Sequence, residues 1–427
     1  MDVESDIDAP VRAVEAALEE LRRGRFVLVR DDEDREDEGD LIIPAQYATA
    51  AQLAFMVRHT SGLICVGMTG RRLDRLRLDP MVAHGDDPRG TAFTVSVDLQ
   101  EGTTTGISAE ERARTIRALA DPDRSADAFS RPGHVFPLRA HPDGVLARAG
   151  HTEAAVDLCR LAGLRPAGAL AEVTNDDGTM ARREQLVRFA EQHRIPLIAV
   201  SDVIRYRQRR DVLVRRGPAG RIPTESGDFS AIAYSYVLDG TDHLAVVRGD
   251  VSGAENVLVR VHSECLTGDV LGSRRCDCGP QLSKALSNIG AVGHGVVIYL
   301  RGHEGRGIGL SRKLRAYGLQ DRGLDTVDAN LAQGLPADTR DYAVAAQILR
   351  DLDVRSVRLM TNNPAKKHGL RMHGVPVVDR VPMVVPPTED NIDYLRTKQE
   401  RLHHRLGLRV EEVPRALAPK PPTNRKD

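Results

Sequence analysis

FVLVRDDEDREDEGDLII, residues 26–43, joins two apolar segments through a dense run of carboxylates. The first segment, Phe26 to Val29, is short and continuously apolar, which is typical of a buried strand. Gly39 interrupts the charge run where a tight backbone turn would favour glycine, and Leu41 to Ile43 is apolar again. The stretch therefore predicts an acidic loop that buried strands hold at both ends.

Helical and strand patterns alternate along the rest of the chain. Val11, Val14 and Leu18 recur at helical spacing near the start. The same reading predicts helices over 153–161, 183–193 and 342–352, and strands over 135–138, 196–200, 257–261, 296–300 and 357–360. This alternation predicts a mixed α/β (α+β) class, with a mixed sheet covered by helices in each domain.

The length of 427 residues indicates two tandem domains, because a single core rarely grows so large. The text RYRQRRDVLVRRGPAG (205–220) is basic and ends in glycine and proline, as linkers often do. We expect a first domain at 1–208, a linker at 209–217, a second domain at 218–412 and a disordered, proline-rich tail at 413–427. Val212 to Val214 could instead pair as a strand.

Composition excludes several function classes. The net charge is −1, with 28% charged and 41% hydrophobic residues, so neither a nucleic acid nor a membrane is an expected partner. The N-terminal segment is acidic and helical without an apolar signal core, and the expected location is the cytoplasm. Five cysteines are too few for a disulfide framework. Cys65 and Cys159 lie in apolar contexts and are expected to be buried.

The acidic loop suits Mg²⁺, which takes oxygen ligands and keeps several waters. RPGHVFPLRA (131–140) and RAGHTEAAVDL (148–158) each add an arginine, a glycine and a histidine. TTTGISAEER (103–112) contains a predicted N-cap at Ser108, and such a helix start can hold a phosphate. A solvated acidic surface is the alternative, and the flanking apolar strands argue against it.

A second constellation is SECLTGDVLGSRRCDCG (263–279), with thiols at Cys265, Cys276 and Cys278. Three thiolates leave one position of a tetrahedral zinc open, which is typical of a catalytic site. The alternative is a structural site completed by His262 or a remote histidine. YLRGHEGRGIGL (299–310) adds a glycine-rich loop with two arginines, and TNNPAKK (361–367) adds two lysines after a strand, both suited to phosphate binding.

Residues from about 25 to 206 resemble 3,4-dihydroxy-2-butanone-4-phosphate synthase through DREDEGDLI, TAFTVSVD, TTGISAEER, RPGHVFPL, GHTEAAVDLCRLAGL and DGTMAR. The resemblance implies that ribulose 5-phosphate loses its C4 as formate, with two Mg²⁺ (or Mn²⁺) ions bound through Glu36 and His151. It also implies a homodimer, and catalytic roles for His134 and Glu172. The implied substrate-binding positions are Arg35, Glu36, Glu38, Asp40, Arg148, Ala149, Gly150, His151, Thr152 and Glu172.

Residues from about 222 to 406 resemble GTP cyclohydrolase II through RVHSECLTGDVLGSRRCDCGPQL, YLRGHEGRGIGL, AYGLQDRGLDTVDAN, DTRDY, TNNPAK and NIDYLRTK. The resemblance implies hydrolysis of GTP to formate, pyrophosphate and a diaminopyrimidinone ribosyl phosphate, so both halves would serve riboflavin biosynthesis. It implies zinc on Cys265, Cys276 and Cys278, and Mg²⁺ with GTP. The implied GTP-binding positions are Arg260, Val261, His262, Ser263, Glu264, Gln281, Glu304, Gly305, Arg306, Thr326, Thr361 and Lys366.

The same resemblance implies Asp338 as proton acceptor, Arg340 as nucleophile and Tyr317 as an active-site tyrosine. Because arginine stays charged, stabilisation of phosphate is an equally good role for Arg340. Two alternatives to a fully active enzyme remain. One domain could be inactive or stop at a formamide, or the chain could be a zinc-containing regulatory module.

Overall fold

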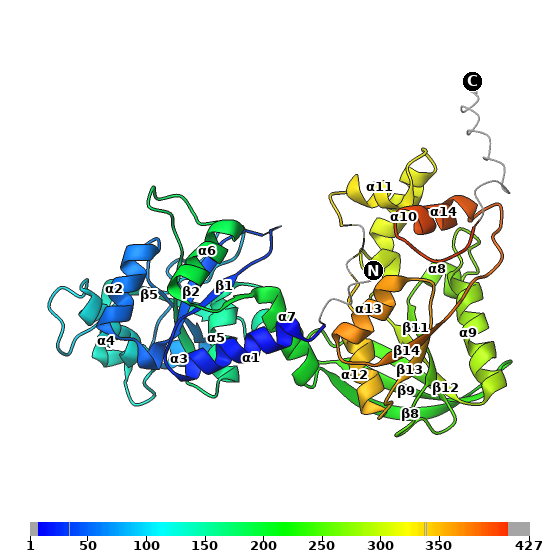
Figure 1. Cartoon of the computed structure of the whole chain (residues 1–427), viewed down its shortest axis with the longest axis horizontal. Helices are drawn as coiled ribbons and strands as arrows, with labels where there is room; N and C mark the ends of the chain where they lie inside the picture. Colours follow the sequence, from blue (N-terminus) through cyan, green and yellow to red (C-terminus); the bar gives the residue numbers. More distant parts are fainter. Residues whose placement is uncertain (1–6, 34, 337, 339, 409–427) are drawn as a thin grey trace, which may run out of the picture. The chain divides into compact units, whose positions relative to one another are not determined.

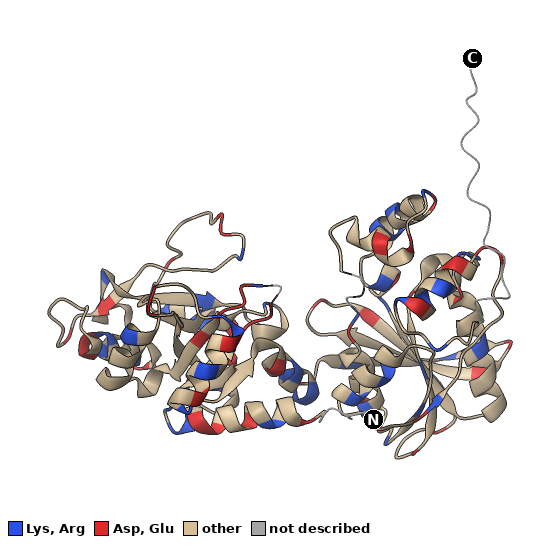
Figure 2. Ribbon diagram, turned by 45° about the horizontal axis from the view of Figure 1, so that its top comes forward, with Lys and Arg blue, Asp and Glu red and all other residues tan. Residues whose placement is uncertain are grey.

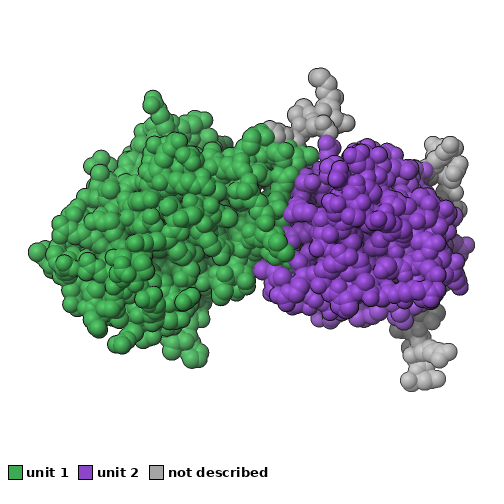
Figure 3. Space-filling view, turned by 90° about the horizontal axis from the view of Figure 1, so that it is seen from below, with its two compact units in different colours: residues 1–213 green, residues 214–427 purple. Residues whose placement is uncertain are grey.

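The computed structural model describes residues 7–33, 35–336, 338 and 340–408. The chain divides into two compact units, residues 1–213 and 214–427, which Figure 3 shows in separate colours. Acidic and basic residues are interspersed along the chain of both units (Figure 2). Among the described residues, no helix combines the length and the apolar character that a membrane span requires.

The first unit is built on a seven-stranded mixed sheet in the order β4-β5-β3-β6-β2-β1-β7. Strands β1, β2 and β5 of this sheet are labelled in Figure 1. Pairs β3/β5 and β1/β7 are parallel and the other neighbours are antiparallel. The strands are β1 (Val27–Arg30), β2 (Gly39–Pro44), β3 (Cys65–Thr69), β4 (Val97–Leu99), β5 (Phe129–Ala140), β6 (Ala167–Glu172) and β7 (Leu197–Ala199). The helices are α1 (Ala9–Arg22), α2 (Ala50–His59), α3 (Gly70–Arg75), α4 (Ala109–Ala120), α5 (His151–Leu161), α6 (Arg183–His193) and α7 (Val200–Arg210), with short 3₁₀ turns at Ala45–Tyr47, Ala126–Ala128 and Gly144–Leu146.

Helices cover both faces of this sheet. Ile42 and Leu170 pack against α1, α5 and α7, whereas Ile43 and Val66, on the opposite face, pack against α2 and α4. The alternation of burial partners along β2 is what a strand covered on both faces requires. The predicted mixed sheet covered by helices is confirmed for this domain.

The second unit is also a seven-stranded mixed sheet, in the order β14-β13-β11-β12-β10-β9-β8. The strands are β8 (Val214–Thr224), β9 (Gly227–Tyr236), β10 (Asp242–Arg248), β11 (Val257–Ser263), β12 (Gly295–Leu300), β13 (Val357–Met360) and β14 (Val377–Val381). The helices are α8 (Leu266–Asp269), α9 (Cys278–Val292), α10 (Leu310–Gln320), α11 (Thr326–Leu331), α12 (Ala343–Asp351), α13 (Pro364–Met372) and α14 (Ile392–Glu400), with a 3₁₀ turn at Glu304–Arg306.

Helices also cover both faces of the second sheet. Ile289 of α9 packs with Leu258 and Val297, while Ile348 of α12 packs with Val259 and Ile298 on the other face. β11, β12 and β13 run parallel, so the segments that follow them meet at one edge of the sheet. Those segments carry the cysteines, the glycine-rich loop and the TNNPAKK stretch.

The connection between the units is shorter than the expected linker at 209–217. Helix α7 continues to Arg210, and β8 begins at Val214, opposite Tyr236 of β9. The alternative strand pairing noted for this stretch thus holds for Val214, while residues 211–213 form the connection. The expected tail at 413–427 lies outside the described residues.

Candidate functional sites

The acidic loop of the first domain is organised around Asp31, whose side chain is fully buried directly after β1. Its two carboxylate oxygens accept hydrogen bonds from the backbone N–H groups of Glu38 at 2.9 Å and Glu36 at 3.1 Å. The loop therefore turns around one carboxylate and is not an extended segment. Ligand atoms of Asp31, Glu36 and His151 all lie within 4.8 Å of one another.

Strand register brings the other predicted residues to the same edge of the sheet. Asp40 pairs directly with Glu172, and Cys65 lies opposite both Leu170 and Phe136. Glu172 lies two residues from Leu170, and His134 lies two residues from Phe136, both toward the N-terminal end of β3. Both residues therefore lie at that end of the sheet. Because side chains alternate along a strand, they also share the face of Cys65. This is the face on which α5, starting at His151, packs.

Asp40 and His151 lie together in this site, with Asp40 Oδ1 3.5 Å from His151 Nδ1. Asp40 Oδ1 and His151 Nε2 are buried without a hydrogen-bond partner among the described residues. Burial, together with the charges of Glu172, Glu36 and Glu38, raises the pKa of Asp40 well above its usual value. Burial lowers the pKa of His151. A neutral imidazole beside crowded carboxylates is a donor set that suits a divalent cation.

Several of the predicted substrate-binding residues lie around the start of α5. Arg148 donates to Glu153 Oε2 at 2.7 Å and to the Arg89 carbonyl at 3.1 Å. Arg35 donates to the Ala149 carbonyl. Gly150 is the N-cap of α5, and Thr152 is buried in its first turn.

His134 and Glu172 each have a partner that fixes their orientation. Asp98 accepts the His134 backbone N–H at 2.9 Å, and its other oxygen lies 2.7 Å from His134 Nδ1. Ser61 Oγ donates to Glu172 Oε2 at 2.8 Å. With Nδ1 engaged, the Nε2 atom of His134 is the one left for chemistry.

Three sequence expectations for this domain have clear outcomes. Cys65 and Cys159 are buried, as predicted. Ser108 caps α4, as predicted. A phosphate there is disfavoured, because the Thr104 and Ser108 hydroxyls donate to the Glu111 carboxylate, which would repel an anion.

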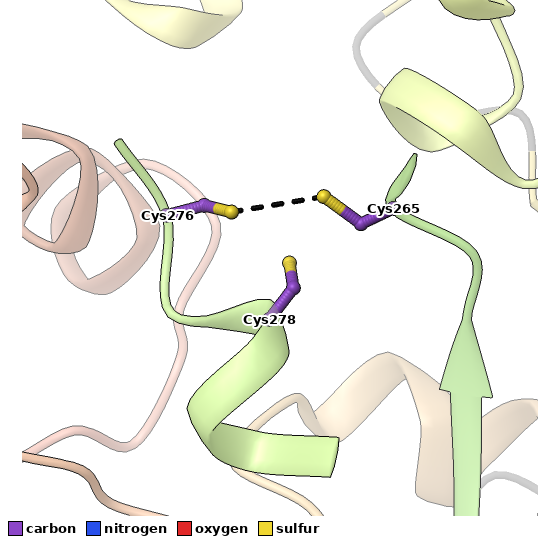
Figure 4. Close-up of side chains that lie close together, drawn as sticks. All are labelled: Cys265, Cys276 and Cys278. Carbon is purple, nitrogen blue, oxygen red and sulfur yellow. Dashed lines mark hydrogen bonds between the residues drawn. The ribbon is translucent and has the colours of Figure 1, made fainter. Parts of the chain in front are cut away.

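In the second domain, the three predicted zinc ligands converge (Figure 4). Cys265 follows β11, Cys276 lies just before α9, and Cys278 is the first residue of α9. The Cys265 and Cys276 sulfurs are 3.6 Å apart. Gly268 lies beneath them, where an added Cβ would be 2.7 Å from Cys276 Sγ. Hydrogen bonding with Cys276 and Cys278, aided by the Lys313 ammonium, holds the pKa of Cys265 well below its usual range.

The alternative of a structural site with His262 as fourth ligand is not supported. Across the described part of the chain, no histidine or carboxylate joins the group formed by the three sulfurs. His262 Nε2 instead lies 3.0 Å from Asp269, which also accepts from the Tyr299 hydroxyl at 2.9 Å. One side of the sulfur cluster faces a pocket, as a catalytic arrangement requires.

Several cations line this pocket, together with two carboxylates, Glu264 and Glu304. Lys366 Nζ donates to the Val261 carbonyl at 2.8 Å, and burial, with the charges of Arg260 and Arg340, lowers its pKa well below the usual value. Arg260 donates to Gln281 at 2.6 Å. An anion would relieve the mutual repulsion of these groups, so the geometry suits phosphate.

Asp338 and Arg340 form a bidentate ion pair, with Arg340 Nε donating to Asp338 Oδ1 at 2.8 Å. Arg340 also reaches Ser263 Oγ at 3.5 Å and lines the pocket. The Tyr317 hydroxyl lies 3.2 Å from Thr267 Oγ1, in the segment that follows Cys265.

All but one of the predicted GTP-binding residues line this pocket, and Val261 contributes its carbonyl to Lys366 instead. The prediction missed Lys313, Tyr394, Lys398 and His404 in the pocket wall, and Asp31 in the first domain. The spacing of Lys313 four residues before Tyr317, on one helical face, could have identified the first of these.

Two mixed sheets, each presenting its own polar site, define a two-domain enzyme with an oxygen-rich site in one domain and a thiol-lined pocket in the other. Residues 15–206 match the family model described as 3,4-dihydroxy-2-butanone 4-phosphate synthase, and residues 215–382 match the one described as GTP cyclohydrolase II.

Known proteins agree over nearly the whole chain. The riboflavin biosynthesis protein RibBA of Nocardia farcinica is 57% identical over 92% of this chain and 95% of its own. The bifunctional chloroplastic protein RIBA 1 of Arabidopsis thaliana is 52% identical over 96% of this chain and 76% of its own. The solved structure of RibBX, described as a two-domain 3,4-dihydroxy-2-butanone 4-phosphate synthase from A. baumannii, covers 86% of this chain and 99% of its own, with 34% identity and a TM-score of 0.64.

The chain belongs to the family of bifunctional riboflavin biosynthesis enzymes that join 3,4-dihydroxy-2-butanone-4-phosphate synthase to GTP cyclohydrolase II. It converts ribulose 5-phosphate to 3,4-dihydroxy-2-butanone 4-phosphate and formate, and it hydrolyses GTP. The predicted function is confirmed, and the reading as a regulatory module is not.

Proposed function

We propose that Glu36 and His151 hold the magnesium ions of the synthase reaction, with Asp31 supporting the loop. The observation that carries this assignment is the convergence of these three side chains within 4.8 Å, beside Asp40, whose Oδ1 atom forms no hydrogen bond among the described residues. When bound, magnesium would stabilise the negative charge that develops on substrate oxygens after loss of a proton next to the carbonyl. Manganese suits the same donor set.

The remaining residues of this site divide the handling of protons and phosphate. Asp40, whose pKa is raised by burial, can exchange protons with substrate hydroxyls, and Glu38 can assist it. His134 Nε2 and the Glu172 carboxylate serve as further acid–base groups. Arg35, Arg148 and the hydroxyl of Thr152 at the start of α5 bind the phosphate.

For the second domain we propose that Cys265, Cys276 and Cys278 bind zinc, and that the cationic side of the pocket binds the triphosphate of GTP with Mg²⁺. The convergence of three thiols on one side of a cation-lined pocket supports this assignment. When bound, zinc would activate water for attack at C8 of the purine. Asp338 accepts a proton, while Lys366 and Arg260 bind phosphate oxygens.

Arg340 is proposed to act as a charged phosphate ligand in preference to a nucleophile. Burial opposes its charge, but bidentate hydrogen bonding to Asp338 raises the pKa of Arg340 above its already high value. A guanidinium held in its charged form has no free electron pair for attack. Thr326 and Thr361 lie in the same pocket, where their hydroxyls can contact the nucleotide.

Selective metal removal tests both assignments in one preparation. After mild EDTA treatment, added Mg²⁺ should restore formate release from ribulose 5-phosphate. A thiol reagent that strips zinc should abolish formate release from GTP and leave formate release from ribulose 5-phosphate unchanged. Loss of both reactions after the thiol treatment, in protein that stays folded by circular dichroism, would contradict two separate metal sites.

A homodimer and a cytoplasmic location are also part of the proposal. None of the five cysteines, all of which lie in the described part of the chain, forms a disulfide, which suits a reducing compartment. Light scattering tests the dimer, and a fully active monomer at micromolar concentration would exclude it.

A further inference from the structure

Lys313 lies at the point where the zinc-ligand loop, the glycine-rich loop and α10 meet. Its ammonium donates to Cys265 Sγ at 3.1 Å, to Thr267 Oγ1 at 2.8 Å and to Glu304 Oε1 at 2.5 Å. All three N–H bonds of the ammonium are used, and the side chain is 10% exposed. None of the roles assigned above requires this residue.

The contact with sulfur sets this lysine apart from an ordinary buried ion pair. Glu304 alone would neutralise the ammonium, and the second carboxylate oxygen of Glu304 accepts the Leu266 backbone N–H at 2.6 Å. The glutamate is thus fixed to the start of α8, and the ammonium is directed at the sulfur of the preceding residue, Cys265. A hydrogen bond to a thiolate ligand reduces the electron density that the ligand donates to its metal.

Three thiolates donate strongly and leave zinc a weaker Lewis acid than three neutral histidines would. A cation bonded to one of the sulfurs offsets part of that donation. The same ammonium orients Thr267, whose hydroxyl contacts Tyr317. Lys313 therefore connects a metal ligand with the tyrosine beside it.

We infer that Lys313 is a positioning residue that tunes the zinc–thiolate centre through its hydrogen bond to Cys265. This inference rests on the zinc site proposed above. It differs from a purely structural role, because removing the hydrogen bond should change the electronic properties of a metal that stays bound.

Cobalt substitution in the full-length chain measures this directly, because the sulfur-to-cobalt charge-transfer band reports electron donation by the ligands. We expect Lys313→Met to shift this band to longer wavelength and to lower the kcat for GTP at least about tenfold. Lys313→Arg, which keeps the charge and N–H donors, should recover most of both. The KM for GTP should change less than kcat.

Lys398→Met is the matched control. Lys398 is also 10% exposed, lines the same pocket and pairs with a carboxylate, Asp277, at 2.6 Å, but no hydrogen bond from its ammonium to a sulfur is seen among the described residues. The charge-transfer band of Lys398→Met should keep the wavelength that it has in the wild type. The synthase reaction gives an internal check of folding in every variant.

Three outcomes would overturn the inference. They are an unshifted band in Lys313→Met at full cobalt content, an equal shift in Lys398→Met, and loss of cobalt from both Lys313→Met and Lys313→Arg in protein that keeps synthase activity. The last result would make Lys313 a residue that the pocket needs in order to form. Failure of the wild-type protein to bind cobalt would instead refute the zinc site itself.

Discussion

Replacing Asp31 with asparagine tests whether one buried carboxylate shapes the synthase site. The carboxylate accepts two backbone N–H groups, from Glu36 and Glu38, and its side chain is fully buried. Asparagine keeps one oxygen, but its amide NH₂ group would face the other N–H donor. Losing one charge-assisted hydrogen bond should destabilise this loop conformation by about 1.5–3 kcal/mol, roughly a tenfold to 150-fold fall in its occupancy.

The assay is the rate of formate release from ribulose 5-phosphate as magnesium is titrated. Asp31→Asn should raise the apparent magnesium requirement by a similar factor, and high magnesium should recover part of the rate by selecting the ordered loop. Formate release from GTP should be unchanged.

Glu33→Gln is the matched control for the loss of one charge. Glu33 belongs to the same acidic run, but its side chain is 64% exposed and pairs with an exposed arginine, Arg183. Glu33→Gln should change the synthase rate by less than about twofold. If Asp31→Asn keeps more than half of the wild-type rate with the same magnesium dependence, the loop does not depend on Asp31 and the reasoning is wrong.

Other perturbations separate the two sites. Glu36→Gln should lower synthase turnover at least about a hundredfold, which corresponds to roughly 2.7 kcal/mol in the barrier. Asp37→Asn should lower turnover by less than about tenfold. Equal small losses in the two variants would indicate a solvated acidic surface. Burial lowers the pKa of Lys366, so the free enzyme should lose the charge of this ammonium as pH rises. The KM for GTP should therefore increase at alkaline pH in the wild type but not in Lys366→Met. Parallel pH profiles of KM in the two proteins would contradict a phosphate-binding role for Lys366. Fragments divided at Val212 should each keep one reaction, measured as formate from each substrate, and two folded but inactive fragments would refute independent sites.

Regular elements with strong patterns could be predicted from the sequence, and their limits depended on pairing partners. Helix α6 and strand β13 have the predicted bounds, because local periodicity and flanking residues define them. Strand β5 was predicted only over 135–138. It starts at Phe129 because Phe129 pairs with Leu99 of β4, a contact that the local pattern does not contain.

The two sites were predictable to different degrees for the same reason. The three cysteines stand out by residue type, so their convergence could be inferred from the sequence alone. Asp31 is one of many carboxylates in its run, and only the folded loop distinguishes buried members such as Asp31 and Asp40 from the exposed Glu33. Lys313 acquires its significance from Cys265, which is distant in sequence and adjacent in space.

The glycine beneath the three sulfurs has a consequence for how metal enters the protein. That glycine is Gly268, and its backbone packs directly against the backbone of Gly279 in α9, where an added Cβ would collide with the Gly268 carbonyl. The shape of the thiol loop is then fixed when the domain folds, and little ordering is left for the metal to bring about. Small zinc domains that fold only around their ion are the opposite case. The zinc proposed for this site should therefore exchange while the protein stays folded, at a rate set by access through the pocket and not by unfolding.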